Sequence, residues 1–166
     1  MILTTLLLTA LVAVAPRARV DSVDACGLFT RDEVKTLAGE EARKPQPSVH
    51  EVIGSYACRT TSSTSQWTVA IEVQRLGTKE ALARNLDALR MAPKSKDAPG
   101  LTPVSGLGDQ AYWGQIDPHN GMFHVVLGTT IVNVQTWGKG AGAGTMEKTR
   151  PIADLVVKRY KERYGK

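Results

Sequence analysis

The chain has 166 residues, with 21 Lys and Arg against 16 Asp and Glu, so its net charge at pH 7 is +5. The basic residues are scattered along the sequence, which argues against a nucleic-acid-binding protein, whereas attraction to anionic lipids or wall polymers is compatible with this charge. Without a leader of the first 20 residues, about 145 residues remain, enough for one domain with a hydrophobic core.

Residues 1–20 are predicted to be a signal peptide or leader, and residues 21–166 to form a single α+β domain. The apolar run over residues 2–15 has the length of a signal-peptide core and is shorter than the roughly 20 residues that span a bilayer. Pro16 directly follows this run, which is atypical of a cleavage site, so an N-terminal helix packed on a cytosolic core is the alternative. A lipid anchor at Cys26 is not expected, because an acidic residue occupies the lipobox before it. The predicted location is periplasmic or secreted, with no transmembrane span in the mature chain.

The first helix of the domain is predicted over residues 31–38. Thr30 and Glu33 have the spacing of a capping box, in which each side chain binds the backbone N–H of the other residue. Gly39 can end the helix in the left-handed conformation. Residues 40–49 are mostly polar and contain two prolines, so they are predicted to form a loop.

Two strands are predicted next, over residues 55–61 and 67–74, and the second shows the apolar–polar alternation of a half-buried strand. The short connection between them predicts an antiparallel hairpin. A second helix is predicted over residues 79–91, with Thr78 as its N-cap and leucines along one side. Residues 93–103 are predicted to be a loop.

The second half of the chain repeats the pattern of strands followed by a helix. Strands are predicted over residues 109–115, 122–127 and 130–137. Gly128 supplies the positive φ that a tight hairpin turn requires. The last helix is predicted to begin near Arg150, which places Pro151 in its first turn. The order α-β-β-α-β-β-β-α predicts an α+β fold, in which a mostly antiparallel sheet of about five strands has three helices packed on one face.

The two cysteines of the chain are Cys26 and Cys58. An even number of cysteines behind an export signal predicts one disulfide in an oxidising compartment. The bond would join the segment before the first helix to a strand of the sheet. Two buried free thiols are the alternative, and a metal pair is disfavoured because neither cysteine has a nearby partner at ligand spacing.

Several short segments of the chain occur in an order that is also found in a known family. They are Asp24-Ala25-Cys26-Gly27-Leu28-Phe29-Thr30, Glu33-Val34, Gly39, a second cysteine in a strand, and Gly106-Leu107-Gly108-Asp109-Gln110-Ala111-Tyr112. This arrangement resembles a family of small bacterial envelope proteins, many of them lipoproteins, that is catalogued as a domain of unknown function. The resemblance covers residues 24–164 and implies an α+β domain outside the cytoplasm with a Cys–Cys bridge. It supplies no catalytic residues, and the chain departs from the lipoprotein members in lacking a lipobox.

No catalytic residue, metal site or cofactor is predicted from the sequence. The glycine-rich segment 138–144 leads from a strand to a helix, but Lys139 precedes its glycines, which is the wrong order for a P-loop. The histidines are His50, His119 and His124. None of them has the spacing of a zinc protease. His124 shares a predicted strand face with Met122, so a soft metal there is a minor alternative.

The predicted function is that of a non-catalytic envelope domain, which binds an envelope protein or a small apolar ligand through its sheet face or a hairpin edge. The candidate binding surface consists of Trp67, Trp113, Trp137 and Asp109. Core filling is the first interpretation for each tryptophan, and a structural corner is the first interpretation for Asp109. A tryptophan that is left exposed would mark a contact surface.

Two other classes of function remain open. One is an envelope hydrolase or transferase that uses carboxylates and His124. It would require His124 to lie within hydrogen-bond reach of Asp109 or Glu72, and Asp117 is a third candidate carboxylate. The other is a purely structural envelope component, which would show neither a catalytic cluster nor an exposed aromatic surface.

Overall fold

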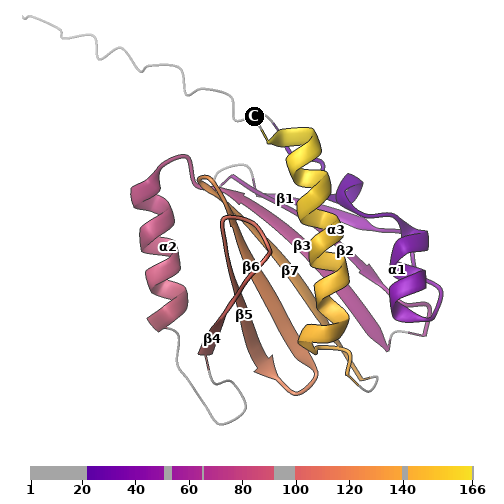
Figure 1. Cartoon of the computed structure of the whole chain (residues 1–166). Helices are drawn as coiled ribbons and strands as arrows, with labels where there is room; N and C mark the ends of the chain where they lie inside the picture. Colours follow the sequence, from indigo (N-terminus) through magenta and orange to yellow (C-terminus); the bar gives the residue numbers. More distant parts are fainter. Residues whose placement is uncertain (1–21, 51–53, 65, 92–99, 140–141, 166) are drawn as a thin grey trace, which may run out of the picture.

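One antiparallel sheet with helices on both of its faces forms the described part of the chain (Figure 1). The computed structural model describes residues 22–50, 54–64, 66–91, 100–139 and 142–165. The predicted leader lies outside these residues. Among the helices described, none is long and apolar enough to cross a membrane.

Two meanders that meet along β3 and β7 make up the sheet. The strands are β1 (Gln46–His50), β2 (Ser55–Thr61), β3 (Trp67–Arg75), β4 (Gly100–Val104), β5 (Gln110–Asp117), β6 (Asn120–Leu127) and β7 (Thr130–Gly138). The helical elements are a short 3-10 helix, η1 (Ala25–Leu28), and α1 (Arg31–Ala38), α2 (Lys79–Met91) and α3 (Met146–Tyr164). Across the sheet the order is β1-β2-β3-β7-β6-β5-β4, with every neighbouring pair antiparallel.

The first two predicted helices are confirmed with the bounds that the sequence indicates. At α1 the Thr30 hydroxyl accepts the Glu33 N–H at 3.2 Å, and the Glu33 carboxylate accepts the Thr30 N–H at 2.7 Å. Gly39 ends α1 with a φ of 75°. At α2 the Thr78 hydroxyl accepts the Ala81 N–H. Local capping chemistry therefore decides both helix starts.

The sheet has seven strands among the described residues, two more than the prediction of about five. The additional strands, β1 and β4, lie in the segments predicted as loops, and they form the two edges of the sheet. Pro47 and Pro103, which argued against strands there, are tolerated because an edge strand has one side without a hydrogen-bonded neighbour. The described side chains of β1 are exposed, so no apolar alternation marks it in the sequence.

The helices are divided between the two faces, so the prediction that all three pack on one face is wrong. The main core lies between the sheet and the elements η1, α1 and α3, where residues such as Phe123, Val134 and Val156 are completely buried. Leu86 of α2 packs instead on Val126 and Ile131, on the opposite face. Successive residues of a strand point to opposite faces, which separates these residues from the main core. Figure 1 shows α2 on the left, away from α1 and α3.

The last helix begins earlier than predicted. Thr145 is its N-cap, with the hydroxyl accepting the Lys148 N–H, so α3 starts at Met146 and Pro151 lies inside it and not in its first turn. The proline removes only one backbone hydrogen bond, at an exposed position where water can satisfy the carbonyl of Glu147.

Two interactions attach the N-terminal segment to the rest of the fold. The predicted disulfide is confirmed: Cys26 of η1 is bonded to Cys58 of β2. Glu33 of α1 also forms a two-pronged ion pair with Arg159 of α3, at 2.7 Å and 2.5 Å. Burial alone would raise the pKa of Glu33, but hydrogen bonds from Arg159 and Thr30 outweigh that effect and lower the pKa below its ordinary value. The ionised carboxylate is thus stabilised in the folded chain.

Removal of the disulfide is expected to lower the free energy of unfolding by about 3–4 kcal/mol, because the bond closes a loop of chain that is free in the unfolded state. The bonded residues are separated by 32 positions. Denaturant unfolding of the oxidised chain, the reduced chain and the double variant Cys26→Ala/Cys58→Ala measures the effect. The reduced chain and the double variant should be destabilised to a similar extent. Equal stability of the oxidised chain and the double variant would contradict this expectation.

Glu33→Gln is expected to lower the free energy of unfolding by about 1–2 kcal/mol at pH 7, because the partly buried Arg159 loses a charged partner. Glu41→Gln is the matched control. Its ion pairs with Arg31 and Lys35 are more than half exposed, and exposed pairs contribute little. Urea unfolding of both variants tests the difference, and similar losses would show that the Glu33 pair has no special role.

Candidate functional site

The face of the sheet opposite α3 is only partly covered. On its two central strands this outer face carries Thr68, Ala70 and Glu72 of β3 and, directly opposite them, Trp137, Gln135 and Asn133 of β7. The helix α2 covers one end of the outer face, where Val126 and Ile131 lie. Among the described residues, no helix lies over the other end, which contains Trp137.

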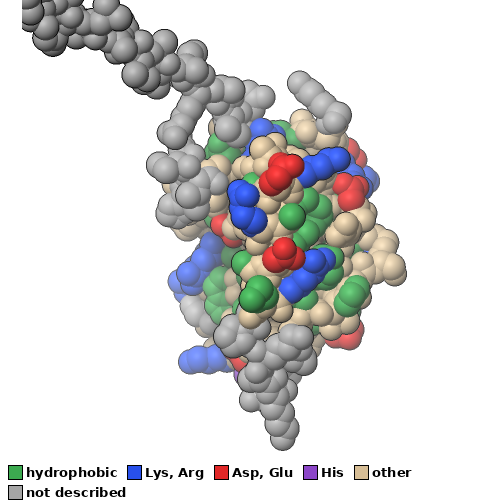
Figure 2. Space-filling model, turned by 90° about the vertical axis from the view of Figure 1, so that its left-hand side faces the viewer, with side chains coloured by type: hydrophobic (Ala, Val, Ile, Leu, Met, Phe, Trp, Pro, Cys, Tyr) green, Lys and Arg blue, Asp and Glu red, His purple; other side chains and the backbone are tan. Residues whose placement is uncertain are grey.

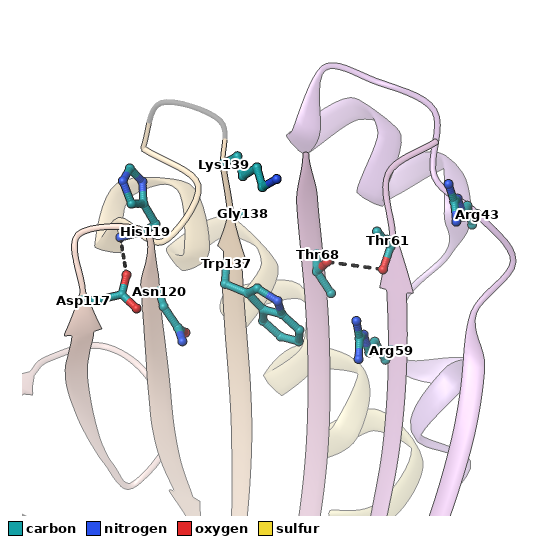
Figure 3. Close-up of a pocket in the computed structure, with 10 residues that line it drawn as sticks. All are labelled: Arg43, Arg59, Thr61, Thr68, Asp117, His119, Asn120, Trp137, Gly138 and Lys139. Carbon is teal, nitrogen blue, oxygen red and sulfur yellow. Dashed lines mark hydrogen bonds between the residues drawn. The ribbon is translucent and has the colours of Figure 1, made fainter. Parts of the chain in front are cut away.

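A hollow of about 490 Å³ occupies this uncovered end (Figure 3). Its base is formed by Thr68 and Trp137 on the central strands. The wall on the β2 side consists of Arg43, Arg59 and Thr61. The wall on the side of the β5–β6 turn consists of Asp117, His119 and Asn120, and Gly138 and Lys139 lie at the end of β7. Residues from five separate parts of the sequence therefore line the hollow, with the half-buried Trp137 at its base.

Positive charge dominates the hollow. Arg43, Arg59 and Lys139 face a single carboxylate, Asp117. The guanidinium carbon of Arg59 lies 5.2 Å from the centroid of the Trp137 ring, a cation–π distance. Within the part of the chain that the structure describes, neither Arg59 nor Lys139 has a carboxylate within ion-pair distance.

This excess of positive charge does not extend over the whole surface. Figure 2 shows the side that carries α2, where basic and acidic side chains alternate with isolated hydrophobic ones. On α2 itself Arg90 pairs with Asp87 at 3.3 Å. Mixed charge of this kind is typical of a solvated helix surface. The hollow thus differs from its surroundings in that two of its cations, Arg59 and Lys139, have no ion-paired carboxylate among the described residues.

The backbone of β7 determines the shape of the hollow. The Gly138 N–H donates to the His119 carbonyl at 3.1 Å, and the Lys139 N–H donates to the Gln66 carbonyl at 2.9 Å. A Cβ atom at position 138 would lie 1.9 Å from the Gln66 carbonyl oxygen. Only glycine permits this approach, which brings the β5–β6 turn and the start of β3 to the same end of the sheet.

A chain of hydrogen-bonded polar side chains, all buried except the half-buried Glu72, crosses the outer face beside the hollow. The Ser55 hydroxyl donates to Glu72 at 2.6 Å, the Asn133 amide donates to Glu72 at 3.1 Å, and the His124 Nδ1–H donates to Asn133 Oδ1 at 2.8 Å. Burial lowers the pKa of His124 below its ordinary value; the hydrogen bond to Asn133 and the charge of Glu72 oppose this shift without cancelling it. The neutral imidazole is therefore the favoured form in the folded chain.

The structure separates His124 from the carboxylates that a hydrolase would use. Asn133 stands between His124 and Glu72. Asp109 lies directly before β5, where its carboxylate accepts the Gly128 N–H at 2.7 Å and so supports a structural corner. Asp117 lies in the hollow and accepts the His119 backbone N–H. Among the described residues, no group of three or more His, Cys, Asp or Glu could hold a metal ion.

The three tryptophans have different surroundings. Trp67 and Trp113 are each 5 % exposed and belong to the main core. The Trp67 indole N–H donates to the Ala143 carbonyl at 3.3 Å, and the Trp113 ring packs against Phe123. Only Trp137 lines the hollow. Of the three predicted tryptophans, Trp137 is thus the one that the fold places at a surface site, and the fourth predicted residue, Asp109, is exposed at a different hollow beside Gly128.

Sequence reasoning did not identify the other residues of the hollow. Arg59, Thr61 and Thr68 lie in predicted strands, but they match no motif and their charges are scattered in the sequence. One usable signal was the alternation in β2, which places Arg59 and Thr61 on the same face. The sequence matches no family model, no curated protein and no solved structure. The site is therefore defined by its geometry in this chain.

The lowered pKa of His124 predicts acid-sensitive stability. At His124 the folded chain binds fewer protons than the unfolded chain, in which the histidine pKa is about 6.5. The contribution of neutral His124 to the stability of the fold is therefore complete above about pH 6.5 and is lost as the pH falls. In denaturant unfolding between about pH 7.5 and 5.5, His124→Gln should reduce the slope of stability against pH relative to the unsubstituted chain. An unchanged slope in His124→Gln would refute the assignment to His124.

Proposed function

We propose that this chain is an exported, non-catalytic domain that binds a ligand or partner at the hollow around Trp137. The observation that carries this proposal is the position of Trp137 in an open hollow, beside two cations without acidic partners among the described residues. Tryptophan and arginine are the side chains most enriched at binding hot spots, and here they lie together in an open hollow.

Three features support export. The disulfide between Cys26 and Cys58 indicates an oxidising compartment. The apolar run over residues 2–15 has the character of a signal-peptide core. The segments around Cys26 and Gly106 resemble a bacterial envelope family. Together they favour a periplasmic or secreted protein without a lipid anchor.

The geometry supports binding better than catalysis. In the hollow the contact between Asp117 and His119 uses the backbone N–H of His119, so it does not orient the imidazole as a base. His124 is 8 % exposed and has Asn133 as its partner, not a carboxylate. A hydrolase or transferase that uses His124 remains the alternative, and a purely structural role is a second one.

A photo-crosslinking experiment in the cells that produce the protein tests this proposal. The photoreactive aromatic residue p-benzoylphenylalanine replaces Trp137 in one variant and the exposed Lys158, on the opposite side of the sheet, in a control variant. We expect an adduct at position 137 that is absent at position 158 and is lost when Arg59→Ala is added. The adduct mass distinguishes a macromolecular partner from a small ligand.

Other outcomes would reject the proposal. The same adducts at both positions, or none at position 137, would remove the hollow as the binding site. Turnover of a small molecule by the purified chain that disappears in His124→Gln, with no adduct at position 137, would favour the enzymatic alternative instead.

A further inference from the structure

We propose that the hollow recognises a phosphate monoester group of its ligand, placed on the side of Arg59, Thr61 and Thr68 within reach of Lys139. This inference rests on the proposed function, because it names the chemistry of a ligand for the same site. It also differs from the sequence prediction of an apolar ligand, since the residues that line the hollow are mainly polar or charged.

The charge of the hollow suits an anion with two negative charges. Arg59 and Lys139, which have no carboxylate within ion-pair distance among the described residues, contribute two positive charges. A phosphate monoester carries about −1.5 to −2 charges at pH 7, whereas a carboxylate carries one. The balance therefore favours the phosphate.

The hydrogen-bonding groups of the hollow are mainly donors. Arg59 and Lys139 have only donors in their side chains, and neither makes a hydrogen bond with another described residue through them. Arg43 already donates a hydrogen bond to the Ser63 carbonyl at 3.0 Å, so its donors are not counted in this set. A planar guanidinium such as that of Arg59 binds two oxygens of a phosphate at once.

Two hydroxyls add to this donor set. Thr61 Oγ1 and Thr68 Oγ1 lie 3.3 Å apart, and a pair of hydroxyls that shares one hydrogen bond keeps a second O–H for a ligand. These neutral donors supply directional contacts that a diffuse basic surface lacks.

The position of Asp117 decides which side of the hollow the phosphate occupies. Figure 3 shows Asp117 and His119 on the β5–β6 side, with Trp137 between them and the group formed by Arg59, Thr61 and Thr68. A phosphate beside Asp117 would be repelled, so it belongs on the Arg59 side. The Trp137 ring then offers an apolar surface to whatever carries the phosphate, and Asp117 can accept a hydrogen bond from a ligand hydroxyl.

Titration of the oxidised full chain with methyl phosphate and phenyl phosphate, in phosphate-free buffer at low salt, tests this inference. Isothermal titration calorimetry gives the Kd, and ¹H–¹⁵N NMR shifts locate the bound ligand. We expect saturable binding, with the largest shifts at Thr61, Thr68 and Lys139. Phenyl phosphate should bind more tightly than methyl phosphate, and Trp137→Leu should remove that difference.

The charge contact is tested by a matched pair of substitutions. Arg59→Gln should weaken phenyl phosphate binding by about tenfold or more, because a charged, two-pronged contact is lost. Arg84→Gln removes the same charge from an exposed position on α2 and should have little effect. Thr61→Val, which removes a hydroxyl without changing the charge, should weaken binding by a smaller factor. Circular dichroism and thermal unfolding confirm that each variant is folded.

Three results would overturn the inference. They are equal weakening by Arg59→Gln and Arg84→Gln, binding that does not saturate, and equal affinity for benzoate and phenyl phosphate. Its failure is separable from that of the proposed function. A crosslink at position 137 that phenyl phosphate does not reduce would preserve the binding site and reject the phosphate. Phosphate binding without any crosslink at position 137 would contradict the proposed function.

Discussion

The antiparallel pairing of β3 with β7 is the interaction on which the rest of the structure depends. Each half of the sheet is a meander of neighbouring strands, and only this ladder, from Trp67 opposite Gly138 to Arg75 opposite Thr130, joins the halves. On one face it aligns buried residues such as Ile71 and Val134 beneath α3. On the other face it places Thr68 beside Trp137 and Glu72 beside Asn133. A shift of one residue in this register would exchange the two faces and destroy the core and the hollow together.

The fold is predictable from sequence where local chemistry decides it. The Thr30–Glu33 capping box and the Gly128 turn act between residues close in the chain, so their structures follow from short patterns. The edge strands β1 and β4 escape such reasoning, because each contains a proline and neither shows a clear apolar alternation. Only pairing with β2 and β5 makes them strands. The side on which α2 packs depends equally on distant residues, since Leu86 meets Val126 and Ile131 only after β6 and β7 have joined the sheet.

The candidate site is less predictable than the fold for the same reason. Trp67, Trp113 and Trp137 all lie in strands, and the sequence alone does not tell which one reaches the surface. Trp137 does so because it follows Thr136, which is buried on the α3 side, and because α2 covers only the far end of its face. Arg59 and Lys139 are 80 positions apart in the sequence. Their common environment exists only because β2, β3 and β7 are adjacent, so a scattered basic composition becomes local charge through topology.

The bond between Cys26 and Cys58 also determines how the chain would carry mechanical load. Tension applied to the chain ahead of Val23 passes through the two sulfur atoms directly into β2, next to the centre of the sheet. The chain between the two cysteines, which includes α1 and β1, is bypassed and bears none of that tension. Those elements would therefore not be peeled away in sequence, and mechanical unfolding would first have to shear β2 from β3. A reducing environment would remove this protection and expose the N-terminal elements to the pull.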